Sequence, residues 1–144
     1  MKSHFELNLK IFLNLNTTTM PSHFDIFNQF LRKYVEFTDA ELLDFNNKCS
    51  CVEFSKGDLV MKAGQVQKNL YFINKGIMRT FIELDNGETK IHNFRSENMS
   101  VSGYAYINYE DKFKALVSAD CLEDCVLIQV PIEAINYVIN HIKL

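Results

Sequence analysis

Four glycines divide the stretch from Lys56 to Gly87 into short runs of β-forming residues, and this pattern constrains the fold more than any other feature. The glycines stand at positions 57, 64, 76 and 87, and the runs between them are rich in Val, Ile, Tyr, Phe and Thr. Such runs, closed by turn residues, are typical of antiparallel strands joined by tight turns. Asn86-Gly87 favours a hairpin with a two-residue type I′ turn. That turn needs positive φ at both positions, and Asn-Gly tolerates positive φ best.

Strand-like sequence extends beyond this stretch on both sides. Five strand candidates fall within roughly 45 residues, namely C-V-E-F-S, D-L-V-M-K-A, L-Y-F-I-N-K, I-M-R-T-F-I-E-L and T-K-I-H-N-F. The segment 95–112 is less regular and predicts a loop with room for one helical turn. Strand character returns in K-A-L-V-S-A-D-C and C-V-L-I-Q-V. The close, even spacing predicts a mainly β fold, a sandwich or roll.

Helical spacing is found before and after these strands. From Pro21, apolar residues recur every three or four positions, and a second helix begins at Thr38, where T-D-A-E forms a capping box with Glu41. A third helix is predicted from Pro131. The residues expected on the apolar faces are Phe24, Phe27, Phe30, Leu31 and Tyr34 in the first helix, Leu42, Leu43 and Phe45 in the second, and Ile132, Ile135, Val138, Ile139 and Ile142 in the third.

The length and charge of the chain narrow its class. A chain of 144 residues fits one domain with its own core, and we divide it into a poorly defined extension, 1–19, and a domain, 20–144, with Met20 as a candidate natural start. The net charge of -3 disfavours direct nucleic-acid binding. No apolar tract reaches the length of a membrane span, and the N-terminus lacks a cleavage signal, so we expect a cytoplasmic protein without membrane contact.

Neither metal chemistry nor catalysis finds support in the residue pattern. The cysteines at 49, 51, 121 and 125 fit neither a zinc pair nor a disulfide framework, and we interpret them as small buried thiols rather than a four-thiolate metal site. A cupin-like metal roll, the main rival fold, needs a cluster of histidines, whereas His92 is the only histidine in the predicted sheet. No G-x-S-x-G motif is present, so we expect no enzyme activity.

Several motifs, taken in order, resemble the cyclic-nucleotide-binding domain of Crp/Fnr-type bacterial regulators, in particular their divergent Bacteroidetes branch. They are T-D-A-E-L, F-S-K-G-D-L-V-M-K-A-G, L-Y-F-I-N-K-G-I-M-R, D-N-G-E and C-L-E-D-C-V-L-I, and the resemblance covers about residues 20–141. It implies a double-stranded antiparallel β-roll, a jelly roll, with short flanking helices, whose ligand state changes the posture of the C-terminal helix. In the family that helix lengthens into a dimer interface and leads to a winged helix-turn-helix, and neither follows in this sequence.

The resemblance also implies where a ligand would bind and how that site has changed. The family cradles the cyclic phosphate with a Gly-Glu pair at a helix start and an Arg about ten residues later, because helix amides and a guanidinium suit a phosphate. This chain has Tyr104-Ala105 after Gly103 in place of the pair, and Ala115 or Lys114 in place of the Arg. A lysine ammonium cannot form the two parallel hydrogen bonds that an arginine guanidinium forms with a phosphate. Cyclic-nucleotide binding is therefore disfavoured, and no cofactor is expected.

The remaining residues of this region leave alternatives open. Tyr104, Tyr106 and Tyr109 either line a pocket for another planar or apolar effector or pack the roll shut. Arg95 and Lys114 together form a weak candidate anion site, and Arg79 is interpreted as a solvated strand residue. We expect a non-enzymatic sensor domain with a degenerate nucleotide pocket. The alternatives are a cupin-like roll and a truncated remnant of a longer regulator, and the last helix either covers the roll or forms a homodimer.

Overall fold

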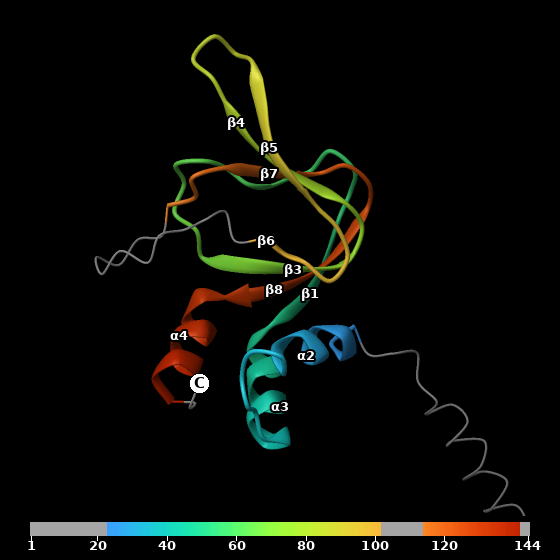
Figure 1. Cartoon of the computed structure of the whole chain (residues 1–144), viewed down its shortest axis with the longest axis vertical. Helices are drawn as coiled ribbons and strands as arrows, with labels where there is room; N and C mark the ends of the chain where they lie inside the picture. The colour runs from blue at the N-terminus through green and yellow to red at the C-terminus, as the bar shows by residue number, and fades with distance from the viewer. Residues whose placement is uncertain (1–22, 102–113, 142–144) are drawn as a thin grey trace, which may run out of the picture.

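The computed structural model of the protein describes residues 23–101 and 114–141. Two helices come first, strands follow, and one helix comes last (Figure 1). The elements are α2 (Asp25–Leu31), α3 (Asp39–Lys48), β1 (Ser50–Phe54), β2 (Leu59–Met61), β3 (Asn69–Lys75), β4 (Met78–Glu83), β5 (Thr89–Arg95), β6 (Ser100–Val101), β7 (Ser118–Cys121), β8 (Cys125–Pro131) and α4 (Ile132–His141).

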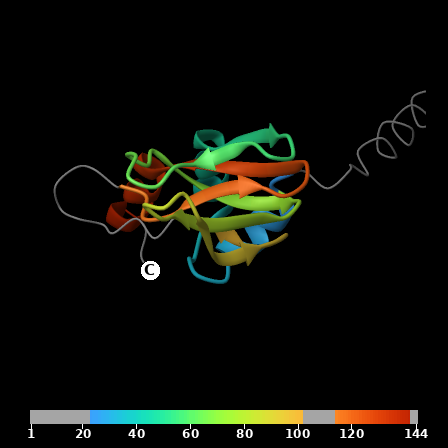
Figure 2. The same cartoon turned by 90° about the horizontal axis from the view of Figure 1, so that it is seen from above.

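The strands form two four-stranded antiparallel sheets that face each other across a shared core. One sheet has the order β1-β8-β3-β6 and the other β2-β7-β4-β5. Of the consecutive strands, only β4 and β5 lie in the same sheet, and every other connection passes from one sheet to the other. The three helices lie below the first sheet in Figure 1, and Figure 2 shows the strands of the roll from above. The predicted mainly β roll with flanking helices is therefore confirmed, as are the strand runs expected between residues 51 and 94.

The hairpin between β4 and β5 is present, but its turn differs from the predicted type I′ turn. The Leu84 N–H donates to Glu88 O at 2.8 Å, and the Gly87 N–H donates to Leu84 O at 2.9 Å, which encloses three loop residues. Gly87 has φ +83°, whereas Asn86 is not in the positive-φ region. A three-residue loop places the left-handed requirement on one residue, and glycine meets it without strain. The Asn86 side chain instead accepts from the Glu88 N–H at 3.0 Å.

The helices α2 and α3 cover one face of the first sheet. The buried cluster that joins them to the sheet consists of Phe27, Phe37, Leu42, Phe45, Phe72, Ile128, Val130, Ala134 and Val138. The predicted capping box is present: the Thr38 hydroxyl accepts from the Glu41 N–H at 3.2 Å, and the Glu41 carboxylate accepts from the Thr38 N–H at 2.8 Å. Two predicted core residues are wrong, because Leu43 is 63% exposed and Tyr34 is 69% exposed. Tyr34 lies beyond the end of α2 at Leu31, so the helical spacing no longer holds there.

The last helix packs on the roll through a different set of residues than expected. Ala134 and Val138 are buried in the cluster beneath the first sheet, and Ile135 packs against its edge. Ile139 was expected on the same apolar face, but it is 48% exposed. Pro131 is the last residue of β8, where it pairs with Asn69, so the helix begins one residue later than predicted.

A second cluster fills the inside of the roll between the sheets. Its buried members are Met61, Tyr71, Ile73, Met78, Val101, Ala119, Cys121, Cys125 and Leu127. Cys121 and Cys125 are buried as predicted, but Cys51 is exposed, so the expectation of four buried thiols is wrong for that residue. Val101 belongs to β6, a short strand inside the segment that the sequence predicted to be a loop. None of the helices in the described part of the chain has the length and apolar character needed to cross a membrane.

Candidate functional site

The structure describes only part of the ligand-binding set that the sequence predicts. Gly103, Tyr104, Ala105 and Tyr106 lie outside the described residues, as does Tyr109. Arg95, Lys114 and Ala115 are described, and they are the part of the predicted set whose surroundings can be given.

Lys114 and Ala115 are attached to the connection between β2 and β3. Lys114 forms an isolated antiparallel bridge with Val66, and its side chain is exposed. The Ala115 N–H donates to Gln65 O at 3.0 Å, and Ala115 O accepts from the Gly64 N–H at 2.7 Å. Ala115 is 2% exposed. The backbone at Ala115 is therefore fixed by two hydrogen bonds, and its methyl group supplies packing but no charge.

Arg95 lies on an edge strand of the second sheet. It is the last residue of β5 and pairs with Met78 of β4. In the order β2-β7-β4-β5, β5 forms one edge of the sheet, whereas Lys114 pairs with a residue that follows β2, the strand at the opposite edge. Arg95 therefore lies on an edge strand of the second sheet, whereas Lys114 lies in an isolated bridge outside the named strands.

Arg79 was predicted to be a solvated strand residue, but it forms an ion pair with Asp120. Its guanidinium donates to both carboxylate oxygens of Asp120 on β7, at 2.8 and 3.0 Å, and lies over the Phe81 ring at 4.9 Å from the centroid. Its side chain is 31% exposed. The hydrogen bond with Asp120 raises the pKa of Arg79. Because Met78 and Thr80 on either side are buried, Arg79 points away from the roll interior, and its role here is structural.

A polar side-chain pair joins β4 and β5. The Thr80 hydroxyl donates to the Asn93 side-chain oxygen at 2.7 Å, across β4 and β5. Thr80 is 3% exposed and lies one pleat from Met78 on the same face. Cross-strand side-chain pairing of this kind satisfies both polar groups, and sequence alone did not point to it.

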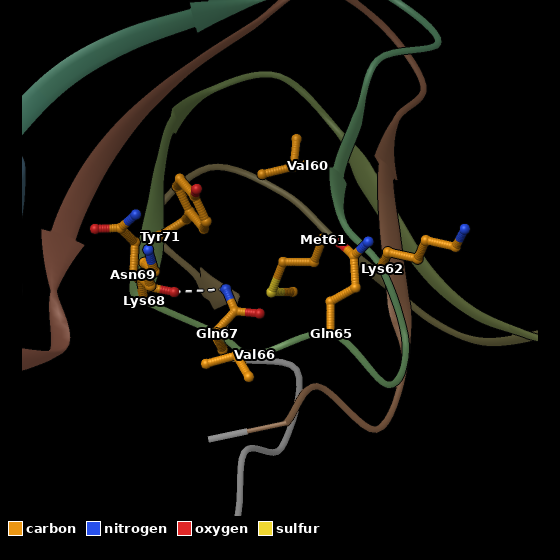
Figure 3. Close-up of a pocket in the computed structure, with 9 residues that line it drawn as sticks. All are labelled: Val60, Met61, Lys62, Gln65, Val66, Gln67, Lys68, Asn69 and Tyr71. Carbon is orange, nitrogen blue, oxygen red and sulfur yellow. Dashed lines mark hydrogen bonds between the residues drawn. The ribbon is translucent and has the colours of Figure 1, made fainter. Parts of the chain in front are cut away.

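A cavity opens between β2 and β3, and sequence reasoning missed it. Its volume is about 180 Å³, and it is lined by Val60, Met61, Lys62, Gln65, Val66, Gln67, Lys68, Asn69 and Tyr71. Met61 and Tyr71, at 4% and 8% exposure, belong to the interior cluster. In Figure 3 the side chains of Met61, Gln67 and Tyr71 converge on this space, whereas Lys62 points away from it. The run K-A-G-Q-V-Q-K-N reads as an ordinary solvated loop, so no local signal predicts a cavity there.

The polar groups of the cavity are arranged around Asn69. The Gln67 side-chain N–H donates to Asn69 O at 2.6 Å, and Gln67 is 8% exposed although it belongs to a loop (Figure 3). Burial raises the pKa of the Tyr71 hydroxyl, and a hydrogen bond with the Asn69 side chain opposes part of that shift. The lining of the cavity is therefore mainly polar, with the Gln67 amide held by a hydrogen bond and Met61 and Tyr71 among its apolar members.

The described part of the chain contains no candidate metal site. Across residues 23–101 and 114–141, no group of three or more His, Cys, Asp or Glu side chains is placed to hold a metal ion. His92 stands on β5, and the other described histidines, His23 and His141, lie outside the sheets.

The two antiparallel sheets and the helix that follows β8 define a β-roll with flanking helices. A family model described as "Cyclic nucleotide-binding domain" matches residues 51–141, which is more than half of the chain. The chain therefore belongs to the cyclic nucleotide-binding domain family. No curated protein matches it.

Solved structures of low sequence identity share this fold. The sensor domain of the transcriptional regulator DNR from Pseudomonas aeruginosa superposes with a TM-score of 0.70 at 14% identity, over 83% of this chain and 77% of that chain. The regulatory domain of Toxoplasma gondii PKA, crystallised with cAMP, gives 0.66 at 14% identity, over 78% of this chain and 41% of that chain. The Thermus thermophilus catabolite activator protein gives 0.59 at 16% identity, over 72% and 47%. The chain thus spans less than half of the last two structures.

Proposed function

We propose that this chain is the non-enzymatic sensor domain of a Crp/Fnr-type regulator, in which occupancy of the roll changes the posture of α4. The observation that carries the proposal is the position of β3 between the cavity and α4. Tyr71 lines the cavity, and the next residue, Phe72, lies on the opposite face of the strand in the buried cluster with Val138 of α4. A ligand that moves β3 therefore presses on the packing of α4, because close-packed cores transmit displacement.

The connection of α4 to the roll supports the same mechanism. The helix follows β8 without a loop, and β8 lies between β1 and β3 in the sheet. Its inner side is buried at Ala134 and Val138, whereas Tyr137 and Ile139 are 42% and 48% exposed. The exposed side supports contact with a second copy of the chain as the output, in keeping with the dimer helix that the Crp/Fnr resemblance implies.

A small-molecule effector other than a cyclic nucleotide fits the residues best. The resemblance implies an arginine at the position of Ala115 or Lys114. The Ala115 backbone forms hydrogen bonds with Gly64 and Gln65 and its methyl group is buried, while Lys114 supplies a single ammonium in place of the guanidinium. Without the guanidinium, a phosphate in the roll would lose its main charged partner. DNA binding, in this proposal, belongs to another domain or another chain.

Amide hydrogen exchange of α4 tests the proposed coupling. Compounds that raise the melting temperature of the full chain should also change the exchange of residues 132–141, because the helix repacks when the roll is occupied. The exchange of β5, an edge strand of the second sheet with no residue in the cluster around Phe72, serves as the comparison. A compound that stabilises the roll and leaves α4 exchange unchanged would contradict the proposed sensor mechanism.

A further inference from the structure

We infer that a contact between the ammonium of Lys48 on α3 and the ring of Tyr137 on α4 holds α4 in its posture, and that this contact breaks when α4 moves. The inference rests on the proposed function, because it names the residues that regulate the posture of the proposed output helix. It concerns residues 44–48 and 131–141, all of which the structure describes, and it does not depend on the identity of a ligand.

The helices α3 and α4 join the roll at the same end of one strand pair. In the antiparallel pairing of β1 with β8, Ser50 lies opposite Gln129, so the start of β1 is next to the end of β8. α3 ends at Lys48, shortly before β1, and α4 begins directly after Pro131 (Figure 1). The strand register therefore brings Lys48 and α4 together, although they are far apart in the sequence.

The Lys48 ammonium lies over the Tyr137 ring. Its Nζ is 3.8 Å from the ring centroid, which is the geometry of a cation–π contact. The same ammonium donates to Asp44 Oδ2, one turn earlier on α3, at 3.0 Å. An ammonium has three N–H donors, so the ion pair leaves it free to face the ring as well. Its own helix therefore positions the Lys48 charge for the contact with α4.

The Tyr137 ring is also positioned by its own helix. The His141 ring stacks on it, with the two centroids 4.5 Å apart and the planes at 15°, and His141 Nδ1 lies 3.0 Å from Tyr137 O. Side chains four residues apart are neighbours on a helix surface, so this pair restricts the rotation of the tyrosine ring. Movement of α4 away from α3 therefore has to separate the Tyr137 ring from Lys48.

The packing between the two helices is incomplete beside this contact. A hollow open to solvent, about 430 Å³ in volume, lies there and is lined by Lys48, Pro131, Glu133, Ala134 and Tyr137. α3 itself is anchored, because Leu42 and Phe45 are buried beneath the first sheet. At this place movement of α4 is opposed by the Lys48–Tyr137 contact rather than by close packing.

Amide hydrogen exchange of the full chain, without any added compound, tests the inference. Lys48→Met keeps the length of the side chain and removes its charge. The amides of residues 132–141 should then exchange roughly two- to fivefold faster, the effect of one exposed cation–π contact. Tyr137→Leu should give a similar increase, although leucine favours a helix more than tyrosine does. The amides of β5, which has no residue in the cluster around Phe72, should not change.

Three further variants assign the effect to the contact itself. Tyr137→Phe keeps the ring, so the exchange of α4 should match that of the natural chain. Asp44→Asn removes the ion pair and leaves the ammonium, so it should raise α4 exchange less than Lys48→Met does. The double variant with Lys48→Met and Tyr137→Leu should exchange no faster than either single variant, because both substitutions remove the same contact. A cooperative melting transition of each variant shows that it is folded.

Any of four results overturns the inference. They are unchanged α4 exchange in Lys48→Met, an increase in Tyr137→Phe as large as in Tyr137→Leu, an increase in Asp44→Asn as large as in Lys48→Met, and effects that multiply in the double variant. Failure of the proposed function is a separate result. Faster α4 exchange in both single variants, together with roll-stabilising compounds that never alter α4, supports the inference and contradicts the sensor mechanism. A compound that alters α4 exchange while Lys48→Met behaves as the natural chain does the reverse.

Discussion

Gly76 is the described glycine at which an added side chain has the least room. It has φ +109° at the passage from β3 to β4, and a Cβ there would lie 2.5 Å from Cys125 Sγ and 2.9 Å from Asp124 O. Both the backbone conformation and the space therefore exclude other residues. We expect Gly76→Ala to lower the free energy of unfolding by roughly 2–5 kcal/mol, as strain and overpacking add.

Gly64→Ala is the matched control for this prediction. Gly64 has φ +81°, and a Cβ there meets nothing within 4 Å, so only the backbone strain of about 1 kcal/mol remains. Urea unfolding of both variants gives the comparison. Equal losses would show that the contact with Cys125 contributes nothing.

The buried thiols predict how stability depends on alkaline pH. Burial raises the pKa of Cys121 to about 12 from 9.0, and a hydrogen bond with Cys125 adds to the shift. Above pH 9 the unfolded chain loses this proton while the folded chain keeps it, so the stabilisation present below pH 9 is lost as the pH rises toward 12. Urea unfolding at pH 8 and at pH 10.5 should therefore show a larger loss for the natural chain than for Cys121→Ala, and equal losses would refute the assignment.

At the residue scale, contacts between residues close in the sequence could be predicted, whereas contacts between distant residues could not. The capping pair Thr38 and Glu41 was predictable because its partners stand three residues apart. The Arg79–Asp120 ion pair was not, because it joins residues 41 positions apart through the pairing of β4 with β7. The burial of Gln67 was missed for the same reason: its surroundings come from strands that meet only in the folded chain.

At the scale of elements, the predicted helix α4 is present, but not every residue expected on its apolar face is buried. Val138 is 7% exposed and lies in the cluster with Phe72, whereas Ile139 is 48% exposed. We expect Val138→Ala to lower the free energy of unfolding by roughly 1–3 kcal/mol, as two buried methyl groups are lost.

Ile139→Ala provides the comparison within the same helix. Both substitutions replace a β-branched residue by alanine, so the change in helix propensity is similar, and the exposed position should cost less than about 0.5 kcal/mol. Thermal unfolding measured at several protein concentrations serves both variants. A larger loss for Ile139→Ala, dependent on concentration, would show that α4 is stabilised mainly by a second copy of the chain.

The elements also show which local rules hold. Strand runs bounded by glycine were placed correctly because alternation and turn residues are local signals. The turn at Asn86-Gly87 was assigned to the wrong type, because loop length depends on how β4 and β5 pair, and the bulge between Thr80 and Phe81 changes that register. β6 was missed because two residues give no periodicity, and Val101 is placed by its pairing with Tyr71.

At the scale of the whole molecule, the order and spacing of strands were enough to predict the roll, and the family match confirms the fold. The cavity could not be predicted, because its lining comes from the segment between Val60 and Tyr71, which encloses a space only when β2 of one sheet and β3 of the other are brought together in the roll.

Isothermal titration of the full chain with cyclic AMP and cyclic GMP, with thermal-shift readings on the same samples, tests the central claim most directly. A roll that senses a small molecule other than a cyclic nucleotide should give neither heat nor a shift in melting temperature with either compound, in a sample whose unfolding is cooperative. Micromolar binding of either nucleotide would contradict the claim, and would mean that Lys114, Arg95 and backbone amides replace the missing glutamate and arginine.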